Sequence, residues 1–171
     1  MQKQTAESLT QNMSASLTLH ASLVQLNQTG VLLLGPSGSG KSELCLHLLE
    51  RGHQLVSDDA VTLSVENTAL TGQPSTPLLQ SIHLRALGLL NPVHHFGLQA
   101  VIPRSTISLA IQLIEHYPKD MPTSLSLPNT SITFLNYTIP LLYLPTLSAV
   151  PAAIRLESYV KHFTLMTSTT K

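Results

Sequence analysis

The sequence predicts an α/β fold with a mixed sheet, and three features support this prediction. Residues 15–23 alternate between apolar and polar side chains, which is typical of a strand with one buried face. Residues 31–34 form a continuous apolar run, as expected for a strand covered on both faces. Residues 41–51 then repeat apolar side chains at four-residue spacing, which predicts a helix that ends at Gly52.

The rest of the chain adds further strands and one more helix. Alternation or apolar runs predict strands at residues 54–57, 61–65, 82–86 and 106–113. Residues 131–144 predict a hairpin that turns near Asn136, and they follow a proline-rich stretch at 117–130 with loop character. A C-terminal helix is predicted by the helical spacing of Ala153, Leu156, Val160 and Phe163.

Length and charge limit the classes of protein to consider. The chain has 171 residues, and we expect one folded domain at residues 15–163, a polar leader at 1–14 and a flexible tail at 164–171. Nine basic residues balance nine acidic ones, and only 11% of residues are charged. This balance argues against a nucleic-acid binder and against a polybasic membrane-surface protein, whereas so few charges favour self-association.

Cysteine content and hydropathy indicate the compartment. Cys45 is the single cysteine, which excludes an intramolecular disulfide and a multi-cysteine zinc site. No apolar run approaches 18 residues, and the start of the chain has no apolar segment of the secretory type. We therefore expect a cytoplasmic protein.

The strongest motif is a phosphate-binding loop between the strand at 31–34 and the helix that follows. It matches G-x-x-x-x-G-K-[ST] without a mismatch, whereas a glycine-rich turn would match by chance only rarely. Glycines let backbone N–H groups surround an anion, the helix dipole favours phosphate, the lysine reaches the β- and γ-oxygens, and the last serine ligates Mg²⁺. These nucleotide-binding residues are Gly35, Pro36, Ser37, Gly38, Ser39, Gly40, Lys41 and Ser42.

Asp58 and Asp59 follow a short predicted strand, 17 and 18 residues after Lys41. Phosphate-loop enzymes hold Mg²⁺ or its waters with an acidic residue at the end of a neighbouring strand. A second carboxylate beside it can accept a proton from an attacking hydroxyl. Two aspartates between strands are also ordinary turn residues, and the phosphate loop upstream favours the site interpretation.

Absent motifs narrow the class further. The chain contains no N-K-x-D, which a guanine-specific GTPase requires, and no L-S-G-G-Q, which a transporter ATPase requires. A small kinase remains. Residues 30–61 (GVLLLGPSGSGKSELCLHLLERGHQLVSDDAV) resemble the catalytic domain of HPr kinase/phosphorylase, a family of bacterial serine protein kinases. His20 begins a matching H-x-x-L-V, residues 82–97 resemble the E-I-R-G-L-G-I-I-x-V signature, and 138–144 (TIPLLYL) resemble a late strand.

The resemblance spans residues 15–160 and implies specific roles. The family transfers phosphate from ATP to a serine of the carrier HPr, regulates sugar transport in this way, and removes that phosphate with inorganic phosphate. Carried over, Asp58 is the base, Lys41 and the loop glycines bind phosphates, and Ser42 and Asp59 bind Mg²⁺. His20 lies near the transferred group. The family's catalytic domains form hexamers, and their fold is similar to that of phosphoenolpyruvate carboxykinase.

The chain also departs from the family. His83 stands where the family has a metal-binding Glu, and Ala86 stands where it has Gly. The late R-P-G-R-N loop, whose arginines face the active site, is replaced by residues 142–146, which carry no cation. Arg85 is then the best remaining cation for the transferred phosphate, ahead of Arg104 and Arg155, although a strand-face ion pair is an equal interpretation of Arg85. The chain resembles the short proteobacterial forms, and we therefore expect it to lack the N-terminal domain of the longer members.

Three functions remain open from the sequence. The first is an ATP- and Mg²⁺-dependent serine kinase acting on an HPr-like protein. The second is a phosphate-loop kinase of a small metabolite, and the third is an ATP-binding sensor without transfer activity. The intact phosphate loop and the aspartate pair favour an enzyme, whereas His83 and the missing late cations keep the sensor open.

Overall fold

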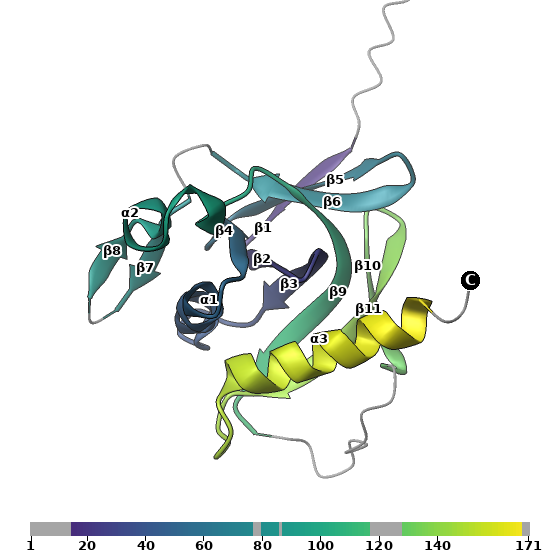
Figure 1. Cartoon of the computed structure of the whole chain (residues 1–171). Coiled ribbons are helices and arrows are strands. Elements are labelled where there is room, and N and C mark those ends of the chain that lie inside the picture. Colours follow the sequence, from purple (N-terminus) through teal and green to yellow (C-terminus); the bar gives the residue numbers. More distant parts are fainter. Residues whose placement is uncertain (1–14, 77–79, 86, 117–127, 169–171) are drawn as a thin grey trace, which may run out of the picture.

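The computed structural model describes residues 15–76, 80–85, 87–116 and 128–168 (Figure 1). Groups of strands are separated by helices along the chain, and the sheet carries both parallel and antiparallel pairs, which confirms the mixed α/β class. The elements are β1 Ser16–Leu19, β2 Ser22–Leu26, β3 Thr29–Leu34, α1 Lys41–Glu50, β4 Gln54–Ser57, β5 Val61–Glu66, β6 Ala69–Pro74, β7 Ile82–Leu84, β8 Gly88–Leu90, α2 Pro92–Phe96, the 3-10 helix η2 Leu98–Ala100, β9 Ser105–Ile114, β10 Thr130–Phe134, β11 Tyr137–Pro145 and α3 Ala152–Ser168.

The main sheet is mixed, with strand order β1-β5-β6-β9-β3-β2-β4, and β11 and β10 extend it beside β9. β3 runs parallel to β9, and β9 runs parallel to β11. β4 is antiparallel to β2, which is antiparallel to β3, so β4 runs in the same direction as β3. The carboxyl ends of β3, β4, β9 and β11 therefore share one edge, which is where ligands bind in open α/β sheets.

Two hydrophobic cores cover the two faces of the sheet. Val31 and Leu33 of β3 contribute to the core beneath α1 and α3, whereas Leu32 between them contributes to the core on the opposite face, with β1, β5 and β6. All three side chains are fully buried, as the continuous apolar run predicted. Figure 1 shows α1 and α3 on the same side of the sheet. None of the described helices is long and apolar enough to cross a membrane.

The structure differs from the predictions in several elements. β6, β8 and α2 were not predicted, and the strand expected at 82–86 ends at Leu84. The alternating segment 15–23 forms two strands, because β1 pairs with β5 whereas β2 pairs with β3 and β4, and the chain changes partner at His20. The C-terminal helix continues to Ser168, past the boundary expected at Phe163, since Thr164, Thr167 and Ser168 all donate hydroxyl hydrogen bonds within it. The leader at 1–14, residues 117–127 and residues 169–171 lie outside the described residues.

Candidate active site

The phosphate loop connects β3 to α1 and has the backbone that its glycines allow. Gly40 precedes the helix with φ of 92°, and its carbonyl accepts the first helical hydrogen bond from the Leu44 N–H. Gly38 has φ of 81°, and a Cβ placed there would lie 3.0 Å from Nη2 of Arg85. Side chains disfavour this conformation, and the guanidinium leaves little room for one. The loop thus has the open backbone that a polyphosphate requires.

Lys41 is buried inside the loop. Its Nζ donates to the carbonyl oxygens of Gly35 at 2.8 Å and Pro36 at 3.1 Å, and it lies 3.5 Å from Nε2 of His20. Only 4% of Lys41 is exposed. A buried ammonium needs such partners, and neutral carbonyls leave its charge uncompensated. The loop therefore holds a positive charge where an anion would bind.

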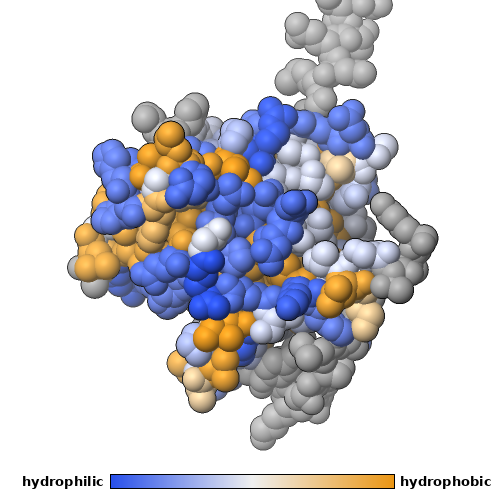
Figure 2. Space-filling model, viewed as in Figure 1, coloured by the Kyte–Doolittle hydropathy of each residue, from blue (hydrophilic) through white to orange (hydrophobic). Residues whose placement is uncertain are grey.

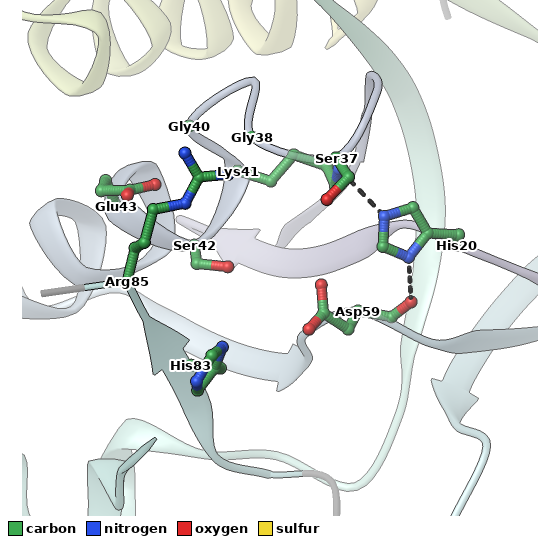
Figure 3. A pocket seen from close by; sticks show the side chains of 10 residues that line it. All are labelled: His20, Ser37, Gly38, Gly40, Lys41, Ser42, Glu43, Asp59, His83 and Arg85. Atoms are coloured by element: carbon green, nitrogen blue, oxygen red, sulfur yellow. Dashed lines mark hydrogen bonds between the residues drawn. The ribbon is translucent and has the colours of Figure 1, made fainter. Parts of the chain in front are cut away.

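His20 joins this loop to the aspartate pair (Figure 3). It lies at the break between β1 and β2, and its Nδ1 is 3.0 Å from the backbone oxygen of Asp59. Its other ring nitrogen faces Lys41. Figure 3 shows the ring between the two residues. The change of strand partner at His20, which was not predicted, brings this side chain into the site.

The two aspartates lie in different surroundings. Asp58 is 2% exposed, and its Oδ1 and Oδ2 accept hydrogen bonds from Ser22 at 2.6 Å and Ser42 at 2.8 Å. Burial raises the pKa of Asp58, although both serine hydrogen bonds act in the opposite direction. Asp59 is exposed, has φ of 66° and lines the cavity beside the loop.

A cavity of 240 Å³ collects most of the predicted site residues. His83 reaches it from β7, and Arg85 from the turn directly after β7, both more than 40 residues after the loop in the sequence. Arg104 pairs with Glu66 and Arg155 donates to backbone carbonyls, so neither lines this cavity. Its lining is formed by His20, Ser37, Gly38, Gly40, Lys41, Ser42, Glu43, Asp59, His83 and Arg85.

These residues fit a magnesium-bound nucleotide. Ser42 and Asp59 offer hydroxyl and carboxylate oxygens, the ligands that Mg²⁺ prefers. Among the described residues, no group of three His, Cys, Asp or Glu side chains is arranged to hold a metal ion. Mg²⁺ is usually bound by one or two carboxylates together with substrate phosphates rather than by an all-protein cage. The donor set therefore suits a cation that arrives with a polyphosphate.

A second cavity adjoins the same loop on the side of β9 and β11. It measures 610 Å³ and shares Ser37 and Gly38 with the first. Its other walls come from the carboxyl ends of the two strands, including Gln112, Glu115 and Leu147. The loop therefore separates two cavities, one beside the aspartates and one beside the strand ends.

Comparison with known proteins agrees with this geometry. The family described as HPr Serine kinase C-terminal domain matches residues 11–171. The chain belongs to this family. The HPr kinase/phosphorylase of Neisseria meningitidis serogroup C is 34% identical over 92% of this chain, and that of Thermoanaerobacter sp. is 36% identical over 87%. The chain spans about half of either relative, 50% and 49%.

A solved structure of an HPr serine kinase has the same fold as this chain. The Hpr(Ser) kinase/phosphatase from Coxiella burnetii superposes with a TM-score of 0.82 and 30% sequence identity. The match covers 90% of this chain and 94% of that one. The predicted family and the predicted mixed α/β fold are both confirmed.

Sequence reasoning missed two residues of this HPr kinase-like site, Glu43 in the cavity lining and Ser22 behind it. Ser22 lies on β2 and was assigned only to the polar face of a strand. It is fully buried and holds one oxygen of Asp58. A buried serine in a strand requires a hydrogen-bond partner. That requirement was the available signal, but the partner is 36 positions away in the sequence.

Proposed function

We propose that this domain is an ATP- and Mg²⁺-dependent protein serine kinase whose acceptor is a phosphocarrier protein of the HPr type. The observation that carries the proposal is one cavity in which a phosphate loop, the basic residues Lys41 and Arg85, and the exposed carboxylates of Glu43 and Asp59 meet. In the reaction, the serine oxygen forms a bond to the γ-phosphorus, the bond to the β-bridging oxygen breaks, and ADP leaves. Positioning and charge stabilisation by Lys41 and Arg85 supply the catalysis.

The different linings of the two cavities support one orientation of the bound nucleotide. The cavity beside Asp59 and Ser42 suits the γ-phosphate, its cation and the acceptor hydroxyl. The cavity beside β9 and β11 is larger, and its lining includes apolar Leu113 and Ile114 and polar Gln112 and Glu115. A ligand site of this mixed character suits a nucleoside. We assign adenosine to this second cavity, with the phosphates crossing the loop between the two.

The surface beside the first cavity supports a protein acceptor over a small metabolite. Figure 2 shows apolar surface over β7, β8 and α2. Leu87, Leu89 and Leu98, on or beside these elements, are 75%, 73% and 80% exposed. His83 on β7 and Arg85 directly after it line the cavity. Exposed apolar patches of this kind mark protein-interaction sites. A protein that docks on this patch would bring a side chain to the cavity.

The base has two candidates. The family resemblance predicts Asp58, whose carboxylate would have to release Ser22 or Ser42 to meet a substrate hydroxyl. Asp59 lines the cavity and is exposed, so it needs no such rearrangement. A general base must come within hydrogen-bond reach of the proton that it removes. This criterion favours Asp59 only where its carboxylate does not ligate Mg²⁺. With Asp59 on the cation, the base is Asp58, as the family resemblance predicts, and that role stays a prediction.

Transfer of label from [γ-³²P]ATP tests the proposal. The protein is incubated with MgATP and purified HPr, and the products are separated by size. Label on a serine of HPr is the expected result. Label on a small molecule would favour a metabolite kinase, and tight ATP binding without transfer would favour a sensor. Asp58→Asn and Asp59→Asn, compared in the same assay, identify the base as the variant that binds MgATP but does not transfer.

Three further predictions accompany this function without a test in the structure. They are assembly as a homo-oligomer, hexameric by family resemblance; a cytoplasmic location; and a role in regulating carbohydrate metabolism through the sugar phosphotransferase system. The reverse, phosphorolytic reaction needs room and charge for an additional inorganic phosphate. Because residues 142–146 carry no cation, we expect that reaction to be the weaker of the two.

A further inference from the structure

Asp58 is held by two serine hydroxyls that come from different elements. Ser22 on β2 donates to Oδ1 at 2.6 Å, and Ser42 in the first turn of α1 donates to Oδ2 at 2.8 Å. Leu23 of β2 pairs with Ser57, the last residue of β4, so Ser22 lies beside Asp58, which directly follows that strand. Each carboxylate oxygen therefore has its own donor, and the carboxylate is fixed between the sheet and the helix.

This arrangement determines what the Ser42 hydroxyl can do. A serine hydroxyl has one proton and two acceptor lone pairs. The proton is used toward Asp58, so the lone pairs of Ser42 remain for the cavity that this residue lines. An oxygen in that state can ligate a cation, whereas a hydroxyl that rotates freely is a poorer ligand.

The position of Asp58 depends in turn on Ser22, because both residues are buried. Ser22 is fully buried, and so is Cys45 close by. The pKa of the Cys45 thiol is raised, first by burial and then by the charge of Asp58. A carboxylate oxygen that loses its partner in such a place incurs the full desolvation cost. The backbone of Asp59 also hydrogen-bonds to Asp58, so without Ser22 the carboxylate would keep that contact and lose the donor that fixes Oδ1 and, through it, the orientation toward Ser42.

We propose that Ser22 is a positioning residue of the Mg²⁺ site, which acts through Asp58 to direct the Ser42 oxygen toward the cation. Nothing in this role requires Ser22 to touch nucleotide, acceptor or metal. The proposal rests on the proposed function only in that MgATP binds at the phosphate loop. It implies that Ser22 affects binding of the metal-nucleotide complex and leaves binding of the bare nucleotide unchanged.

A second buried serine on the same sheet provides a matched control. Ser105 of β9 is 5% exposed, and its Oγ donates to Oε1 of Gln25 at 2.8 Å. It lines neither of the two cavities beside the loop. Ser22→Ala and Ser105→Ala therefore each remove one buried hydroxyl that donates to a side chain, and both should lower the unfolding temperature. Only Ser22→Ala should change the response to magnesium.

The experiment measures ADP affinity by calorimetry, with excess Mg²⁺ and with EDTA, for the wild type and the two variants. The ratio of the two dissociation constants reports metal binding, and a general loss of stability does not change it. Removing a residue that orients a metal ligand typically costs about 10- to 100-fold in metal affinity. We expect the Mg²⁺ enhancement to fall at least about tenfold in Ser22→Ala and to stay at the wild-type value in Ser105→Ala.

The outcomes separate the two levels of inference. An unchanged ratio in Ser22→Ala, with clear Mg²⁺ enhancement in the wild type, would overturn the role of Ser22 and leave the proposed function intact. A wild type that binds no nucleotide under either condition would overturn both. If Ser22→Ala does not fold, Ser22→Cys takes its place, because a thiol of similar size donates only weakly. The expected direction is the same, and a wild-type ratio would again contradict the proposal.

Discussion

Arg85 and Arg155 belong to two regions that border the phosphate loop, and they are used in opposite ways. Arg85, in the turn directly after β7, lines the cavity beside Lys41 and packs over Gly38. Arg155 on α3 donates to the carbonyl oxygens of Pro145 and Val150, and so holds the chain between β11 and α3. One guanidinium is available to a phosphate, and the other stabilises the backbone. The comparison shows that a count of nearby cations does not say how many serve a site.

The other two described arginines extend this comparison. Arg51 pairs with Glu157 of α3, which His53 also contacts, and Arg104 pairs with Glu66 at the surface. The pKa of Glu157 is lowered, chiefly by its hydrogen bond with Arg51. Of the described lysines and arginines, Lys41 and Arg85 alone line the smaller cavity. We therefore expect substitutions of the cations that line the cavity to lower activity, and substitutions of the ion-paired arginines to lower stability.

The largest expected effect is that of Lys41→Ala. This change removes the ammonium group that donates hydrogen bonds to the carbonyl oxygens of Gly35 and Pro36. That group is the main attraction for the β- and γ-phosphates. We expect nucleotide binding to fall below detection in calorimetry while the protein remains folded by circular dichroism. ATP affinity within a few-fold of the wild type would contradict the assignment of the loop.

The next effect is that of Arg85→Ala, which tests the first half of the comparison. A cation on the transferring phosphoryl group accelerates transfer by about 10³–10⁵ in enzymes that use one. We expect a loss of transfer rate at the lower end of that range, with a smaller change in ATP affinity. Arg104→Ala is the matched control and should keep the wild-type rate. Equal rates in the two variants would return Arg85 to the strand-face ion-pair interpretation.

The smallest effect on transfer is expected for Arg155→Ala, which tests the second half. Loss of its hydrogen bonds to Pro145 and Val150 should cost about 1–3 kcal/mol of unfolding free energy. The unfolding temperature should then fall by roughly 2–10 °C in a thermal scan. The transfer rate at 25 °C should stay within a few-fold of the wild type. A rate loss as large as that of Arg85→Ala would show that both arginines act in phosphoryl transfer.

Elements that depend on sequence neighbours were predicted correctly, whereas those that depend on tertiary contacts were not. The phosphate loop, α1, β3 and the hairpin at Asn136 were predictable because each depends on neighbours in the sequence. Leu135 and Asn136 have φ of 51° and 62°, the left-handed backbone that a two-residue hairpin turn needs. The break at His20 was not predictable from alternation, because the alternating pattern continues through it. Only the pairing of β1 with β5 and of β2 with β4 separates the two strands.

The sequence by itself determined the nucleotide-binding motif, the class of fold and the family resemblance, because each is written in residues that lie close together along the chain. The tertiary structure decided which side chains meet: Ser22 beside Asp58, Arg85 over Gly38, and Arg155 away from the cavity. These contacts join residues 10 to 47 positions apart. The pairing of strands and the packing of α3 on the sheet bring these residues together. A local pattern of hydrophobicity does not specify which strands pair.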